Sequence, residues 1–259
     1  MKLDLNLKNK VVFITGSGKG IGKEIATIFA SEGANIILND INNEVLNNCA
    51  KELSISYPNV RVETAFGNVA NENDTIRIFQ KIFTDFGYLD ILINNAGVLI
   101  DKKMIDMTLE EWKRIFTNNL DSIFLATKEA VKIMKPQNNP VIINAGSFGG
   151  LIPAIGYSAY NASKAAISNL TRTMAGELNL IGIRVAGYIP GVVLTDIIKP
   201  MLEREPNRLV AQIPLGRLAE PIEIAKGVVF IASDAGGYIN GTMFEITGGK
   251  LCTQNTGRN

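Results

Sequence analysis

The sequence predicts an α/β fold in which helices cover both faces of one doubly wound parallel sheet. Apolar, β-rich runs alternate with amphipathic stretches from one end of the chain to the other. The runs are apolar throughout, which is typical of parallel strands buried on both faces. With 259 residues, of which 46% are hydrophobic and 20% charged, the chain suits one large domain spanning residues 1–259.

Each element follows from local patterns. Gly33 ends the first helix, Thr108 and Glu111 form a capping box that opens a long helix, and Pro221 occupies a first helical turn. Strands are expected at residues 11–15, 35–39, 60–65, 90–94, 141–145, 184–189 and 243–247. Helices are expected at residues 21–32, 43–53, 72–86, 108–135, 159–180 and 221–232.

Composition excludes several classes of function. The net charge is +1 and no charged tail stands out, so neither nucleic acid nor an anionic membrane surface is expected as a partner. The N-terminus lacks a signal-peptide core, and no run approaches the roughly 20 apolar residues of a membrane span. Cys49 and Cys252 show no pairing pattern, which favours a reducing, cytoplasmic setting.

The chain contains no histidine. This excludes a Ser-His-Asp triad and a His-ligated zinc, and no metal site is expected. Acid/base chemistry at neutral pH would therefore need a perturbed Tyr, Lys, Asp, Glu or Cys.

A glycine-rich loop, TGSGKGIG at residues 15–22, lies between the first strand and its helix. Gly16, Gly20 and Gly22 allow a tight turn, a close approach of backbone to a pyrophosphate, and close helix–strand packing. The free N–H groups at the helix N-terminus would bind the phosphates. Because the loop directly follows an apolar strand, it indicates a Rossmann-type dinucleotide site rather than a merely flexible turn.

The residue that ends the second strand indicates which dinucleotide binds. Asp40 can accept hydrogen bonds from the adenosine ribose and would repel a 2′-phosphate, which favours NAD. Lys19, inside the glycine loop, could instead attract the 2′-phosphate of NADP, although a solvated loop side chain is the favoured interpretation. Ile41 supplies no cation. NAD is the expected cofactor, and NADP remains an alternative.

A tyrosine and a lysine four residues apart suggest the catalytic group. Tyr160 and Lys164 would lie on one helical face, where the ammonium would lower the tyrosine pKa from its usual value near 10. Tyr160 could then exchange a proton with a substrate oxygen that the Ser147 hydroxyl also holds. Considered alone, such a pair arises by chance on many helices, and Tyr157 lies close by.

Together these residues resemble the short-chain dehydrogenase/reductase family. The resemblance runs from about residue 5 to Gly249 and includes the glycine loop, Asp40, NNAG at residues 94–97, Asn119, Ser147, Tyr160 and Lys164, and PGVVLT at residues 190–195. The chain departs from the family's usual residues at Asn68, Ala186 and Thr247, none of which belongs to the catalytic set.

The resemblance implies a role for each matching position. Asn119 would hold a water, Ser147 would orient the substrate, Tyr160 would be the acid/base, and Lys164 would bind the nicotinamide ribose. The cofactor half would span about residues 8–145. The expected cofactor-binding residues are Gly16, Ser17, Lys19, Gly20, Ile21, Gly22, Asp40, Ile41, Asn68, Val69, Asn94, Ala96, Gly97, Tyr160, Lys164, Pro190, Gly191, Val193 and Thr195.

Three functions remain open. The first is an NAD(P)-dependent oxidoreductase acting on a small alcohol or ketone, under a substrate lid at about residues 195–212. The second is an NADPH-dependent enzyme like 3-oxoacyl-(acyl-carrier-protein) reductase, which Asp40 disfavours. The third is a dinucleotide-binding sensor or scaffold without turnover. The resemblance also implies a homotetramer, in which the helices at residues 108–135 and 159–180 pack across a two-fold axis.

Overall fold

A seven-stranded parallel sheet forms the centre of the molecule. In the computed structural model, which describes residues 4–135, 138–204 and 206–253, the strand order is β3-β2-β1-β4-β5-β6-β7. This arrangement confirms the predicted doubly wound α/β class. The strands are β1 (Val11–Ile14), β2 (Asn35–Leu38), β3 (Val62–Thr64), β4 (Ile91–Asn94), β5 (Val141–Ala145), β6 (Arg184–Pro190) and β7 (Met243–Ile246).

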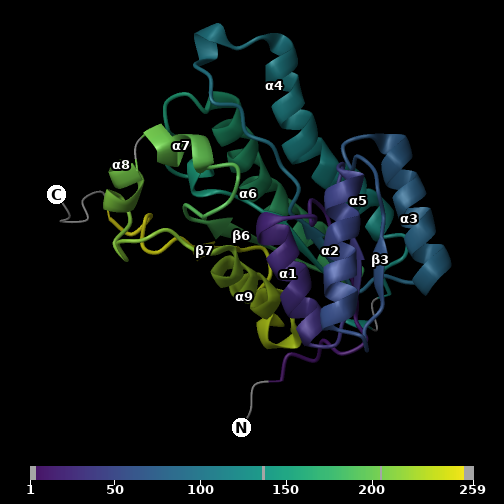
Figure 1. Ribbon diagram of the computed structural model, residues 1–259. Helices are drawn as coiled ribbons and strands as arrows, with labels where there is room; N and C mark the ends of the chain where they lie inside the picture. Colours follow the sequence, from purple (N-terminus) through teal and green to yellow (C-terminus); the bar gives the residue numbers. More distant parts are fainter. Residues whose placement is uncertain (1–3, 136–137, 205, 254–259) are drawn as a thin grey trace.

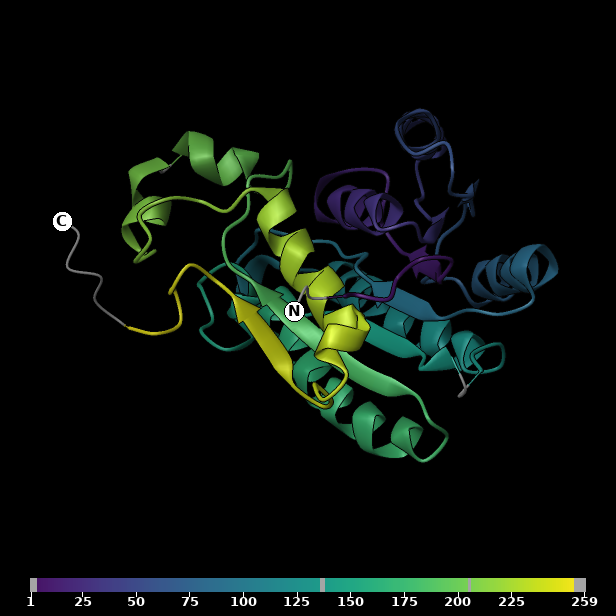
Figure 2. The same ribbon diagram turned by 90° about the horizontal axis from the view of Figure 1, so that it is seen from below.

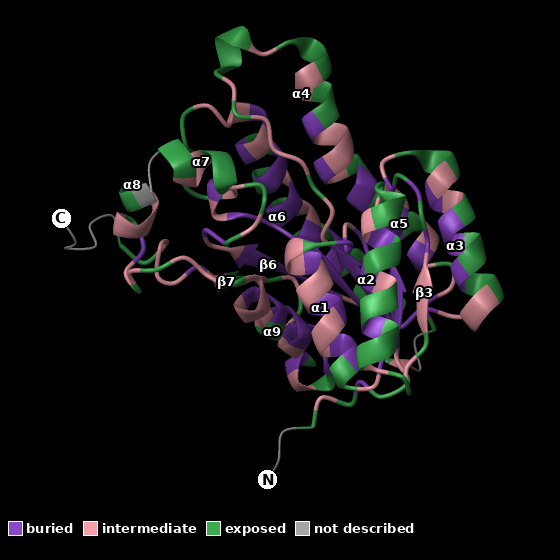
Figure 3. Ribbon diagram, viewed as in Figure 1, coloured by how far each residue is buried: buried purple, intermediate pink, exposed green. Residues whose placement is uncertain are grey.

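Helices cover both faces of this sheet (Figure 2). One face packs against α1 (Gly20–Ser31), α2 (Asn43–Ser56) and α9 (Pro221–Ala232), and the other against α3 (Glu72–Phe86), α5 (Ser122–Ala130) and α6 (Ser158–Asn179). The central strands are buried between these two layers, whereas the outer sides of the helices are exposed (Figure 3). Burial on both faces explains why these strands are apolar without alternation.

The long helix expected at residues 108–135 is interrupted. Thr108 does form the predicted capping box with Glu111 and opens α4 (Leu109–Phe116). A π-helical turn at Thr117–Asp121 then separates α4 from α5, and α5 ends at Ala130. The extra residue of a π turn changes the direction in which the following side chains point, and such turns are frequent at functional sites. The turn contains Asn119, which is buried.

The loops that follow the strands gather at one edge of the sheet, the upper side in Figure 1. Because every strand pairing is parallel, the carboxyl ends of all seven strands meet there. Within the expected lid, two short helices, α7 (Lys199–Arg204) and α8 (Pro206–Ala211), project beyond this edge. Over the described parts of the chain, no helix combines the length and apolarity needed to cross a membrane.

Candidate active site

The glycine loop has the backbone geometry that a pyrophosphate requires. Gly16 and Gly20 both adopt a φ of +60°, a conformation that side chains disfavour. A Cβ at Gly22 would lie 2.4 Å from the Gly16 carbonyl oxygen, so a larger residue there would displace the turn. The loop leads directly into the first turn of α1, and the N–H groups of such a turn can donate hydrogen bonds to phosphate oxygens. These residues fit a dinucleotide.

Asp40 lies beside this loop. Its carboxylate accepts hydrogen bonds from the backbone N–H groups of Gly18, at 3.2 Å, and Asn42, at 3.0 Å. These two bonds hold an acid at the carboxyl end of β2, next to the glycine loop, where an adenosine ribose would lie. Lys19, the residue that could favour NADP, instead forms an exposed ion pair with Asp196 at 2.8 Å.

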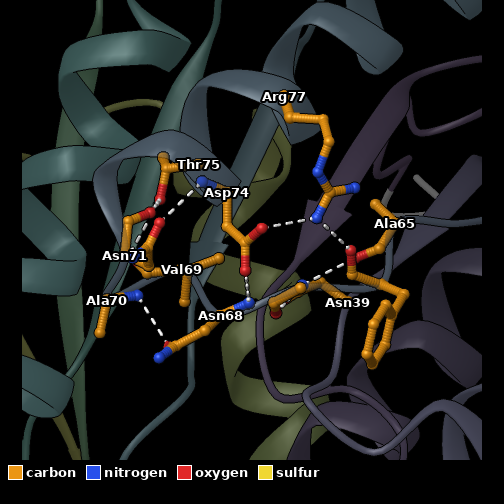
Figure 4. Close-up of polar contacts among 11 residues, drawn as sticks. Asn39, Ala65, Asn68, Val69, Ala70, Asn71, Asp74, Thr75 and Arg77 are labelled. Atoms are coloured by element: carbon orange, nitrogen blue, oxygen red, sulfur yellow. Dashed lines mark hydrogen bonds and ion pairs between the residues drawn. The ribbon is translucent and has the colours of Figure 1, made fainter.

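The loop after β3 is held by an ordered set of polar contacts (Figure 4). The carboxylate of Asp74 accepts from the backbone N–H of Asn68 at 2.9 Å and pairs with Arg77 at 2.8 Å. The buried amide of Asn39 donates to the carbonyls of Ala65 and Gly67, which ties this loop to the end of β2. Asn68 and the buried Val69, both expected to bind the cofactor, therefore lie on a hydrogen-bonded segment near Asp40.

Asn119 is fully buried and bonded through both atoms of its amide. Its Oδ1 accepts from the backbone N–H of Val98 at 2.7 Å, and its Nδ2 donates to the Val98 carbonyl and to the Ser163 hydroxyl. The Ser163 hydroxyl in turn donates to the Tyr160 carbonyl at 2.7 Å. The π turn thus brings Asn119 onto the helix turn that carries Tyr160. Ser163, which provides this connection, is not among the residues expected from the sequence.

Lys164 extends beneath the ends of β4 and β5. Its ammonium donates to the Ala145 carbonyl at 2.8 Å and lies 5.8 Å from the centre of the Tyr160 ring. Burial lowers the pKa of Lys164 from 10.5 to about 8. A Cβ at Gly97 would lie 3.6 Å from this ammonium, so the glycine of NNAG leaves space around it.

Tyr160 and Ser147 form a hydrogen-bonded pair. Burial raises the pKa of Tyr160 above 10, and the hydrogen bond with Ser147 opposes that rise. The expected lowering by Lys164 does not appear, because desolvation dominates while the ammonium is bonded to Ala145. The geometry distinguishes Tyr160 from Tyr157, since Tyr157 is hydrogen-bonded to Asp101 and Arg204 instead.

The segment after β6 lies between the lid and the glycine loop. A Cβ at Gly191 would lie 2.9 Å from the backbone of Thr247, so the chain passes closely under the end of β7. The Thr195 hydroxyl donates to the Val193 carbonyl at 3.4 Å, and its methyl group lies 3.5 Å from the position of a Cβ at Gly20. Pro190, which ends β6, begins this segment. These contacts bring expected cofactor-binding residues that follow β6 next to the glycine loop.

A second ion pair connects α7 to the loop that follows NNAG. Arg204, in α7, binds Asp101, and Tyr157 joins the same pair. The apolar hollow of about 650 Å³ nearby is lined by Met104, Ile105, Ile155 and the α6 residues Asn161 and Ala165, among others. Tyr160 and Lys164 do not line it, so this hollow is not assigned to the substrate.

Comparison with known proteins identifies the family. The family model for short chain dehydrogenases matches residues 10–206. The chain belongs to the short-chain dehydrogenase/reductase family. It is thus an oxidoreductase of a family that uses a nicotinamide cofactor and acts on hydroxyl and keto groups.

Several members of this family are close relatives. The chain is 35% identical to 3-oxoacyl-(acyl-carrier-protein) reductase FabG of Thermotoga maritima, over 95% of this chain and 100% of that protein. It is 32% identical to 3alpha-hydroxysteroid dehydrogenase of Mediterraneibacter gnavus, over 93% of this chain and 97% of that protein. The crystal structure of a putative gluconate dehydrogenase from Agrobacterium tumefaciens superposes with a TM-score of 0.92 at 29% identity, covering 97% and 100% of the two chains.

Proposed function

We propose that this protein is an NAD-dependent oxidoreductase that interconverts a secondary alcohol and a ketone, with Tyr160 as the general acid/base. The observation that supports this most directly is the linked set of Tyr160, Ser147, Lys164 and Asn119 at the same sheet edge as the glycine loop. A protein that only bound a dinucleotide would have no need of this set.

Each of the three side chains, Tyr160, Ser147 and Lys164, has a separate role in the proposed reaction. A bound nicotinamide dinucleotide supplies or accepts the hydride. During oxidation Tyr160, as phenolate, accepts the proton of the substrate hydroxyl, and during reduction its phenol returns a proton to the carbonyl oxygen. Ser147 donates a hydrogen bond to the same oxygen, and Lys164 stabilises the phenolate once its ammonium turns from Ala145 towards the tyrosine.

The preference for NAD rests on Asp40. Its carboxylate is held by two backbone N–H groups beside Gly18, where the 2′-phosphate of NADP would meet a negative charge. The cation that could offset this repulsion, Lys19, is paired with Asp196.

A second candidate is the reduction of a 3-oxoacyl thioester. The relatives described as 3-oxoacyl-(acyl-carrier-protein) reductases, from Thermotoga maritima and Vibrio cholerae, are 35% and 34% identical to this chain along 95% of its length. Asp40 counts against this candidate if such a reductase uses NADPH.

The test replaces the acid/base. Tyr160→Phe should lower kcat by about 10²–10⁴-fold, the usual contribution of a positioned acid/base, while NADH binding remains. Turnover is followed at 340 nm with cyclopentanol, a 3α-hydroxysteroid or a 3-oxoacyl thioester, whichever the wild-type protein converts. Unchanged turnover in the variant would disprove the role of Tyr160. If the wild-type protein bound NADH but converted no substrate of this kind, the sensor function would be favoured.

We further expect a homotetramer in a reducing, cytoplasmic compartment. A surface groove of about 680 Å³ between α5 and α6 supports the assembly, since its lining includes Leu120, Phe124, Leu125 and Leu170. Phe124 is 57% exposed in the single chain, as expected for a side chain that a second subunit would cover. Both cysteines are unpaired, as in proteins of reducing compartments.

A further inference from the structure

A buried tyrosine lies beneath the glycine loop and has no part in the chemistry above. Tyr188, in β6, is 1% exposed and is among the largest fully buried side chains of the described chain. Its hydroxyl donates to Oδ1 of Asn95 at 2.9 Å. Burial raises its pKa well above the usual value, with a smaller contribution from the nearby Tyr160, so the hydroxyl keeps its proton and remains a donor.

The partner of Tyr188 supports the glycine loop from below. The Nδ2 group of Asn95 donates to the carbonyl of Thr15 at 3.0 Å and to that of Gly16 at 2.9 Å. The Thr15 hydroxyl accepts from the backbone N–H groups of Asn95 and Ala96, both at 3.0 Å. The Asn95 amide therefore donates both its hydrogens to the first two carbonyl groups of the loop.

Small residues make room for this connection. A Cβ at Gly22 would lie 2.7 Å from Nδ2 of Asn95, so the amide needs a glycine at that position. In the sheet, Tyr188 is paired with Ala145 of β5, and Asn95 follows directly after Asn94 of β4, which is paired with Asn144. The tyrosine thus reaches across the short side chain of β5 to the next strand.

We infer that Tyr188 is a positioning residue for cofactor binding: it fixes the Asn95 amide, which in turn holds Thr15 and Gly16 in the conformation that receives the pyrophosphate. Without the phenol hydroxyl, Oδ1 of Asn95 would lose the only donor recorded for it in the described chain. An amide whose part-buried oxygen has lost its donor can rotate towards other partners, and the two loop carbonyls would then lose their donor. This inference rests on the proposed cofactor site.

The test is Tyr188→Phe, which removes the hydroxyl and keeps the ring. The dissociation constant for NADH, measured by nicotinamide fluorescence, should rise about 2- to 10-fold, the range expected for one hydrogen bond. KM for the cofactor should rise with it, while kcat at saturating cofactor changes less than KM. Tyr57→Phe, at the end of α2, is the matched control and should bind NADH as the wild-type protein does.

A double-mutant cycle separates positioning from a general loss of stability. In an Asn95→Ala background, Tyr188→Phe should cause no further loss of NADH affinity, because the connection is already absent. Additive losses in the cycle, or unchanged affinity in Tyr188→Phe despite a lower melting temperature, would overturn the inference. If the wild-type protein bound neither NADH nor NADPH, the proposed function would fail and the inference with it. Wild-type binding with an unaffected Tyr188→Phe variant would refute the inference alone.

Discussion

At the scale of single residues, burial sets the protonation state of the proposed catalytic residues, Tyr160 and Lys164, before any ligand binds. Desolvation lowers the pKa of Lys164 to about 8 and raises that of Tyr160. Both shifts favour the neutral form of the side chain, so the tyrosine keeps its proton in the unliganded site. The charged pair that oxidation needs must therefore form when cofactor and substrate replace these local contacts.

The Lys164 shift predicts how stability depends on pH. Below pH 8 the lysine is charged in both folded and unfolded chains, so the folded state carries the full desolvation cost. Between about pH 8 and pH 10 the unfolded chain binds more protons, and stability should rise with pH. We expect wild-type stability to gain roughly 1–3 kcal/mol relative to Lys164→Met between pH 7.5 and pH 9.5.

Urea unfolding at a fixed protein concentration measures this difference. Equal pH dependence in the two proteins would show that the Lys164 ammonium is not desolvated. The comparison with Lys164→Met removes the contributions of other titrating groups, including the buried tyrosines.

At the scale of elements, the segment expected to be the lid contacts the glycine loop directly. Asp196, at the start of the lid, binds Lys19 of the glycine loop and Lys199 of α7, and these partners lower its pKa to about 2. An ion pair between the two segments would slow the release of a bound dinucleotide.

Asp196→Asn should therefore raise the NADH dissociation constant by about 2- to 5-fold at low ionic strength, since exposed ion pairs contribute little. The difference should vanish at about 0.5 M NaCl because salt screens such pairs. Asp85→Asn breaks an exposed ion pair with Lys81 on α3 and serves as the control. If the effect of Asp196→Asn persisted at high salt, it would not arise from the ion pair between Asp196 and Lys19.

Most of the strands and helices could be predicted from the sequence, because strands buried on both faces and capped helices leave strong local patterns. The helices at residues 72–86 and 221–232 have the predicted bounds. The π turn at Asn119 could not be predicted in this way, because its cause is tertiary: both atoms of the amide bind Val98 and Ser163 from other segments. The hydrogen bond of Tyr188 could not be predicted either, because the residue lies in an apolar strand and its partner, Asn95, follows a different strand.

At the scale of the whole molecule, we expect subunits of a homotetramer to pack against the groove between α5 and α6. Phe124→Glu would place a charge in this groove and should convert a tetramer into smaller species, as measured by light scattering. Phe83→Glu, on α3, changes a side chain of similar exposure, 55%, and should leave the assembly intact. A wild-type protein that is monomeric at micromolar concentration would contradict this expectation.

A fluorescence titration with NADH and NADPH tests most directly whether a nicotinamide dinucleotide binds between the glycine loop and Asp40. We predict tighter binding of NADH by the wild-type protein, and loss of that preference in Asp40→Ala. Tighter binding of NADPH by the wild-type protein would contradict the cofactor assignment, and binding of neither would contradict the site itself.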